Sequence, residues 1–97
     1  MVVFAFASCP FCKKAKELLD SKKARYTWLL LDERADGAAI RARLGARTGR
    51  TSVPSVWVGG AYCGGLNDGL DDSCPGLVPL EQRGELDARL RAVGALA

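Results

Sequence analysis

Two cysteines separated by two residues are the strongest chemical signal in this chain. The sequence has four cysteines and no histidine, and Cys9 and Cys12 enclose only Pro10 and Phe11. A crosslink that closes so short a loop removes little chain entropy, so it stabilises a fold poorly. A thiol pair this close can instead open and close as a disulfide, by attack of a thiolate on a sulfur. The motif therefore indicates thiol-disulfide exchange rather than a structural bridge.

Cys9 is expected to be the attacking sulfur. A helix is predicted to begin at the motif, because Pro10 suits a first helical turn. The apolar residues that follow recur with helical spacing: Phe11, Ala15, Leu18 and Leu19. The free amides and the dipole at a helix N-terminus stabilise an anion, and Lys13 and Lys14 add positive charge. Cys12, one turn inward, is then placed to resolve the mixed disulfide.

Metal binding and core burial are alternative interpretations of the cysteines. A zinc site would need two further ligands, and without histidine these would be Cys63 and Cys74, which form no second closely spaced pair, or carboxylates. No metal site is therefore predicted. Cys63 is expected to be a small core side chain. Cys74 is expected to be a loop cysteine beside acids that disfavour a thiolate, with a regulatory or intermolecular disulfide as the open alternative.

Alternating strand and helix signals place the motif in an α/β fold. The sequence predicts strands at 2–6 and 26–31 and a hairpin at 56–63. A helix is predicted over 38–47, with Ile40 and Leu44 inward, and is ended by Gly45 or Gly49. A last helix is predicted to carry Leu86, Leu90 and Val93. The 26–31 run is so continuously apolar that we expect a strand buried on both faces, at the centre of the sheet. Residues 66–76 are expected to form a loop or a broken helix. The first two strands should pair in parallel through a right-handed crossover.

Length and charge restrict the function classes. A chain of 97 residues suits one domain with a shallow site. The net charge of +3 is mild, and its basic residues are spread along the chain, so no nucleic-acid partner is expected. No apolar run has the roughly 20 residues that span a membrane, so no membrane association is expected. We expect a cytoplasmic protein, or an organellar one if a transit peptide was removed.

Several motifs together resemble the dithiol glutaredoxins over nearly the whole chain. They are the Cys9–Cys12 motif with the Lys-Lys-Ala-Lys-Glu-Leu-Leu that follows it, Leu31-Asp32-Glu33-Arg34, Thr48-Gly49-Arg50, Val53-Pro54, Gly59-Gly60, Gly64-Gly65 and Gly84-Glu85-Leu86. The resemblance implies a thioredoxin-like fold, with a central mixed four-stranded sheet flanked by helices. It also implies a single monomeric domain over residues 1–97, in which 69–76 is a loop insertion relative to the family.

The resemblance further implies a glutathione site beside the cysteines. Its residues would be Pro10, Phe11, Arg50, Val53, Pro54, Gly65, Leu66 and Asn67. A proline peptide bond is ordinarily trans, whereas the family's turn has a cis bond that lets the preceding residue, here Val53, pair with glutathione as an added strand. Asn67 stands where the family has an aspartate, and Phe6 where it commonly has a lysine for the glycyl carboxylate. Arg50 either replaces that lysine or is a solvated cation at a helix end.

The function implied is a glutathione-dependent oxidoreductase. It would reduce protein disulfides or protein–glutathione mixed disulfides, with glutathione as co-substrate, oxidised or glutathionylated proteins as partners, and no permanently bound cofactor. Two alternatives stay open. One is a module that binds a [2Fe-2S] cluster, against which Pro10 argues because cluster-holding relatives usually have glycine or serine there. The other is a redox domain of a larger protein.

Overall fold

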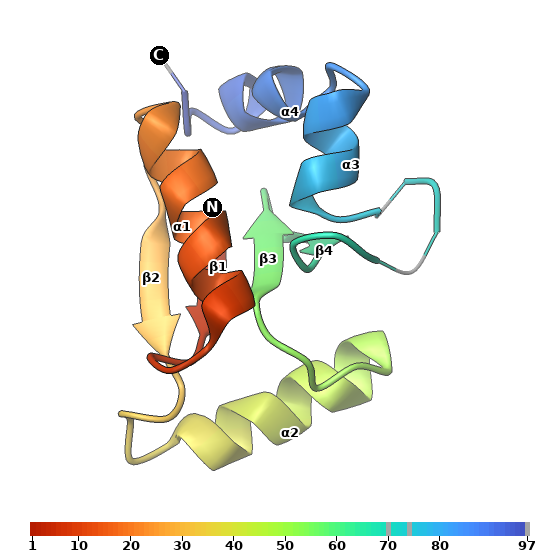
Figure 1. Ribbon diagram of the computed structural model, residues 1–97. Coiled ribbons are helices and arrows are strands. Elements are labelled where there is room, and N and C mark those ends of the chain that lie inside the picture. Colours follow the sequence, from red (N-terminus) through yellow and green to blue (C-terminus); the bar gives the residue numbers. More distant parts are fainter. Residues whose placement is uncertain (70, 74, 97) are drawn as a thin grey trace.

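A four-stranded sheet in the order β2-β1-β3-β4 forms the centre of the computed structural model, which describes residues 1–69, 71–73 and 75–96 (Figure 1). β1 (Val2–Ala5) pairs in parallel with β2 (Thr27–Leu30), and α1 (Pro10–Ser21) makes the crossover between them. β3 (Ser55–Val58) pairs antiparallel with both β1 and β4 (Ala61–Gly64). The predicted mixed sheet, parallel start and hairpin are confirmed.

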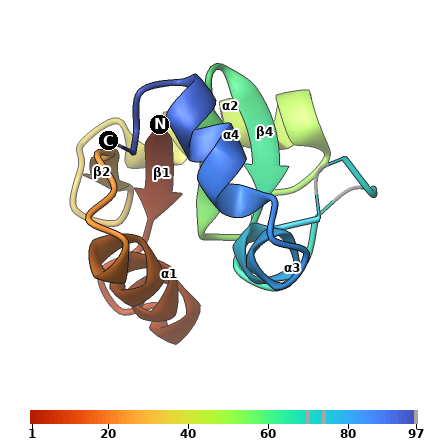
Figure 2. The same cartoon turned by 90° about the horizontal axis from the view of Figure 1, so that it is seen from above.

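Helices cover the sheet on both sides. α1 and α3 (Leu77–Gln82) lie on one side and α2 (Gly37–Thr48) on the other, while α4 (Leu86–Ala92) packs near one end of the strands (Figure 2). The side chains fully buried beneath α1, α3 and α4 form one apolar core: Val3, Ala15, Leu19, Val56, Leu77, Leu80, Leu86 and Leu90. Cys63 is 2% exposed within this core, so its predicted role as a buried side chain is confirmed.

The prediction that the 26–31 strand is central was wrong. β2 lies at the edge of the sheet, with β1 as its neighbour, and Trp28, Leu29 and Leu30 are only partly buried. A continuous apolar run such as 26–31 indicates that both faces of a strand are shielded. It carries no information on how many strands lie alongside, because lateral neighbours are held through the backbone.

The last helical region was also predicted incompletely. Besides α4 there is a separate short helix, α3, which buries Leu77 and Leu80. Pro79 is its third residue, in the first turn, where a missing amide hydrogen costs no helical bond. Val93 lies beyond α4 and is 40% exposed, so it does not extend the buried stripe of Leu86 and Leu90.

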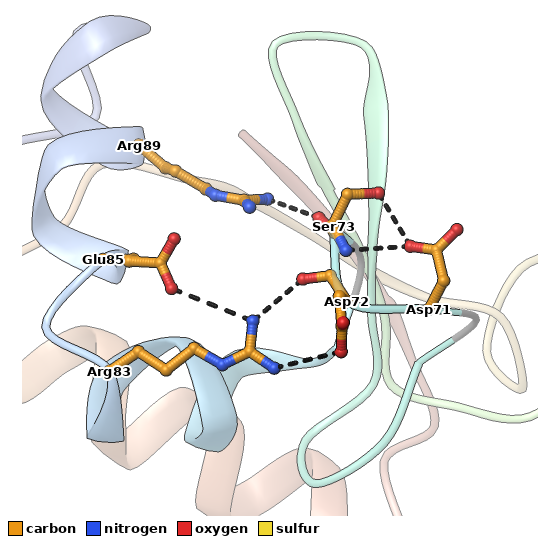
Figure 3. Close-up of polar contacts among 6 residues, drawn as sticks. All are labelled: Asp71, Asp72, Ser73, Arg83, Glu85 and Arg89. Atoms are coloured by element: carbon orange, nitrogen blue, oxygen red, sulfur yellow. Dashed lines mark hydrogen bonds and ion pairs between the residues drawn. The ribbon is translucent and has the colours of Figure 1, made fainter.

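The segment that leads into α3 is fastened to the last two helices. Arg83 donates to the Asp72 carbonyl at 2.9 Å, and Arg89 donates to the Ser73 carbonyl at 2.7 Å (Figure 3). The Asp71 carboxylate accepts from the Ser73 amide and hydroxyl. Residues 71–73 therefore lie against α3 and α4. Cys74, expected to be a loop cysteine with a disulfide as the open alternative, lies outside the described residues. No helix in the described part of the chain is long and apolar enough to cross a membrane.

Lys22 joins the end of α1 to α3 and α4. Its ammonium lies 2.6 Å from both the Glu81 and Asp87 carboxylates, and its side chain is 15% exposed. The hydrogen bonds that Lys22 donates to Asp87 and then to Glu81 raise the pKa of Lys22, and the bond from Lys22 lowers the pKa of Asp87. This cluster of three charged side chains thus connects the end of α1 to two helices that lie far from it in the sequence.

Replacing Lys22 by Met is expected to lower the midpoint of thermal unfolding by a few degrees, because two carboxylates lose their shared partner. The control is Lys14→Met, which removes an exposed lysine of the same helix for which no ion pair is present among the described residues. Equal midpoints for the two variants would show that the cluster does not stabilise the fold.

Candidate active site

The Cys9 sulfur sits at the N-terminus of α1. Cys9 is the N-cap residue, with extended backbone angles (φ −86°, ψ 118°), and its Sγ accepts a hydrogen bond from the Cys12 amide at 3.3 Å. Its own amide donates to the Phe6 carbonyl at 3.3 Å, and the Ala7 amide donates to both Asp32 oxygens at 3.0 Å. The connection from β1 is therefore fixed so that the sulfur faces the free amides of the helix, which stabilise a negative charge there.

The two thiols of the motif have different surroundings. Cys9 is half-buried, whereas Cys12 is 1% exposed. Burial is the largest cause that raises the pKa of Cys12 to about 12, and the neighbouring Cys9 adds to it. Cys12 is therefore a protonated thiol at neutral pH, and Cys9 is the sulfur that can react with an external disulfide.

The turn before β3 forms a second wall beside Cys9. The Val53–Pro54 peptide bond is cis, as the resemblance implied, and the Val53 carbonyl lies 3.9 Å from the Cys9 sulfur. Among the described residues, none accepts a hydrogen bond from the Val53 amide. Val53 therefore offers a backbone donor and acceptor next to the reactive sulfur, as an edge strand does.

A groove of about 240 Å³ runs beside this turn. Its lining is Phe11, Arg50, Ser52, Val53, Pro54, Gly65, Leu66, Asn67 and Asp68. All of the residues predicted for glutathione are among these except Pro10, which is exposed at the start of α1. Phe11 is 52% exposed, so its ring is open to a ligand at the mouth of the groove.

The floor of the groove depends on a close backbone approach at the end of β4. Gly65 donates to the Asp68 carbonyl at 2.8 Å, and Leu77 donates to the Gly65 carbonyl at 2.9 Å. Gly64 has φ +105°, and a Cβ there would lie 2.7 Å from the Asp68 carbonyl oxygen. A larger residue at position 64 would push the 65–68 segment out of place.

Asp68 is a groove residue that sequence reasoning missed, although it directly follows Asn67. Its carboxylate pairs with the Arg50 guanidinium at 2.8 Å. The Arg50 side chain is 22% exposed, so it is not a freely solvated cation at the end of α2. Arg50 instead lies at the end of the groove formed by residues 65–68.

Arg41 is a second residue that sequence reasoning missed. Its guanidinium lies over the Phe6 ring, 4.9 Å from the centroid, and its Nε donates to the Thr51 carbonyl at 2.9 Å. A cation therefore lies next to Phe6, where the family's lysine is missing. Arg41 is one of several arginines on or near α2. The sequence does not single it out, because its place beside Phe6 results from the packing of α2 next to β1.

Comparisons with known proteins agree with this geometry. The family model described as Glutaredoxin matches residues 1–63. The chain belongs to the glutaredoxin family. It is 40% identical over 81 residues to a glutaredoxin of Ricinus communis, covering 82% of this chain and 79% of the relative. It is 35% identical over 92 residues to a glutaredoxin of Pseudomonas aeruginosa, covering 95% of this chain and 96% of that one.

Solved structures confirm the thioredoxin-like fold of this glutaredoxin. A buckwheat glutaredoxin in complex with glutathione superposes with a TM-score of 0.87 at 36% identity, covering 99% of this chain and 80% of that one. The family match and the structural similarity together identify this glutaredoxin as a thiol-disulfide oxidoreductase. Cys9 and Cys12 form its dithiol motif.

Alkylation should separate the two thiols. At neutral pH, iodoacetamide is expected to modify Cys9 and leave Cys12 unreacted, because Cys12 is buried and protonated. In Cys9→Ser, where the hydroxyl can still cap the helix, Cys12 modification should increase steadily as the pH is raised above neutral, because burial still raises the pKa of Cys12. Peptide mapping by mass spectrometry measures both, and fast labelling of Cys12 at neutral pH would contradict the assignment.

Proposed function

We propose that this glutaredoxin uses glutathione to reduce protein–glutathione mixed disulfides and protein disulfides. The observation that carries the proposal is the placement of the Cys9 sulfur 3.9 Å from the Val53 carbonyl, at a turn whose amide is also unused by described residues. A short extended peptide that pairs with Val53 would bring its own cysteine sulfur next to Cys9. Glutathione in the buckwheat complex supports this ligand class.

The charges around Val53 suit the two ends of glutathione. At one end, the side-chain carbonyl oxygen of Asn67 and the Asp68 carboxylate would accept from the γ-glutamyl ammonium, while Arg50 would bind the adjacent carboxylate. At the other end, Arg41 would take the glycyl carboxylate, because Thr51 holds its guanidinium two residues before Val53. Arg41 would thus bind the glycyl carboxylate, a role that the resemblance had left open for Arg50.

The exchange proceeds by two displacements on sulfur. The Cys9 thiolate attacks the glutathione sulfur of a protein mixed disulfide, forming a Cys9–glutathione bond, and the protein leaves as a thiolate that takes a proton from water. A second glutathione thiolate then attacks the bound glutathione sulfur. Oxidised glutathione leaves, and the Cys9 thiolate is restored.

Protein disulfides would need Cys12 as well. After Cys9 attacks such a disulfide, Cys12 loses its proton and attacks the Cys9 sulfur, which releases the reduced protein and leaves a Cys9–Cys12 disulfide for two glutathione molecules to reduce. Burial, the largest cause of the raised pKa of Cys12, persists while Cys9 carries a substrate. We therefore propose that this route is slow at neutral pH compared with removal of glutathione.

Cysteine variants test the proposal in an assay coupled to glutathione reductase. Cys9→Ser is expected to lower the rate by at least roughly a hundredfold on every substrate, because the attacking thiolate is gone. Cys12→Ser should keep its activity on a glutathionylated peptide and lose it on a peptide with an internal disulfide. Activity surviving in Cys9→Ser would refute the mechanism, and equal loss on both substrates in Cys12→Ser would refute the assigned route.

Arginine variants test how glutathione is held. Arg41→Gln is expected to raise KM for a glutathionylated peptide about tenfold or more, with kcat little changed, because a charged hydrogen bond to the glycyl carboxylate is lost. Arg43→Gln is the matched control and should leave KM unchanged, because Arg43 lies on the same helix but does not line the cavity that Phe6, Arg41 and Thr51 share. A peptide disulfide without glutathione should be insensitive to either change, and a KM rise on that substrate too would argue for a general structural effect.

A further inference from the structure

The two faces of the sheet are covered unequally. On the side of α1 and α3, Val3, Val56 and Cys63 are at most 2% exposed. On the other side, where α2 packs (Figure 2), Phe4 and Trp57 stay partly exposed, although they belong to the two central strands. One helix therefore leaves part of an apolar sheet face uncovered.

A second groove of about 450 Å³ occupies this face, larger than the groove beside Cys9. Its lining combines six apolar side chains with two arginines and the hairpin turn: Met1, Val2, Phe4, Ile40, Arg43, Leu44, Arg47, Trp57, Gly59 and Gly60. None of these residues lines the groove beside Cys9. The apolar floor and its separation from the reactive sulfur mark it as a distinct surface.

The charge of this groove is positive and unpaired. Arg43 and Arg47 are both exposed and lie one turn apart on α2. Neither forms an ion pair with a residue in the described ranges, whereas Arg34, Arg50 and Arg83 all do. Two guanidiniums that are four residues apart on α2, beside an apolar floor, can pair with two carboxylates that have the same spacing on a second helix.

An exposed apolar side chain adjoins one end of the groove. Phe11 and Val93 are the most exposed large hydrophobic side chains in the described part of the chain. Phe11 lies in the groove proposed for substrate, and Val93 lies against Gly59, which lines the second groove. Val93 therefore extends the apolar surface beyond the floor.

We infer that this second groove is a docking site for an acidic amphipathic helix of a partner protein. Leucine-type side chains of that helix would cover Phe4, Ile40 and Trp57, and its glutamates would pair with Arg43 and Arg47. Such a helix would lie beside α2 as a second helix on the undercovered face. A partner held there leaves Cys9 open, so it can stay bound while disulfide exchange proceeds. The inference does not depend on glutathione.

The test is a titration of the full chain, labelled with ¹⁵N, with a designed helical peptide of about 18 residues, five turns, that carries leucines on one face and glutamates beside them. We expect chemical shift changes at Phe4, Ile40 and the Trp57 indole, with Val53 and Leu66 unaffected. A peptide with lysines in place of the glutamates is the matched control and should bind more weakly.

The double variant Arg43→Glu/Arg47→Glu should invert this preference. We expect it to bind the glutamate peptide on the order of tenfold more weakly than wild type does, and the lysine peptide more tightly, because exposed pairs turn from attractive to repulsive. Its thiol-exchange rate should equal that of wild type, so failure of the docking inference and of the proposed function can be told apart.

Three outcomes would overturn the inference. One is equal binding of both peptides, which would show nonspecific apolar contact. Another is that a small apolar acid such as decanoate shifts the resonances of the groove and the glutamate peptide does not, which would make the groove a small-molecule site. The third is a wild-type dimer, detected by sedimentation, that the double variant abolishes, which would make a second copy of the chain the occupant.

Discussion

The Cys12 amide donates a hydrogen bond to the Cys9 sulfur at 3.3 Å, and this bond depends on how the chain passes from β1 into α1. The Ala7 amide is held by Asp32, which follows β2, so the parallel β1–β2 pair fixes the approach to the helix. The extended backbone of Cys9 then aims its sulfur at amides that have no partner inside the helix. Ordinary helix geometry thus gives this sulfur amide partners for a negative charge, in a chain that has no histidine.

The rest of the site is brought to this sulfur by antiparallel pairing. β3 lies beside β1, so the turn before it places Val53 next to Cys9. The chain then turns back through β4, and the return at Leu77 fixes residues 65–68 as the far wall of the groove. Segments separated by more than forty residues along the chain therefore meet at one end of the sheet.

The small size of the fold creates two asymmetries. One thiol of the pair is half-buried and the other is inside the protein, so burial is the main cause that raises the pKa of the inner thiol, whereas the outer one stays within reach of solvent. One sheet face is sealed by several helices, while the other is covered by α2 and keeps apolar side chains within reach of solvent. In a domain of this length there is too little chain to cover both faces equally.

Local signals in the sequence determined the dithiol motif, the start of α1 at the motif and the hairpin, because spacing, proline and glycine act over a few residues. For the end of α2 they left Gly45 and Gly49 open, and the structure places it at Gly49. The family resemblance added the mixed four-stranded sheet and the cis bond before Pro54. Local patterns failed for the edge position of β2 and for the separate helix α3. The pairing of Arg50 with Asp68 and the stacking of Arg41 on Phe6 were decided only by the tertiary structure, because charges that are distant in sequence find their partners through strand pairing and helix packing.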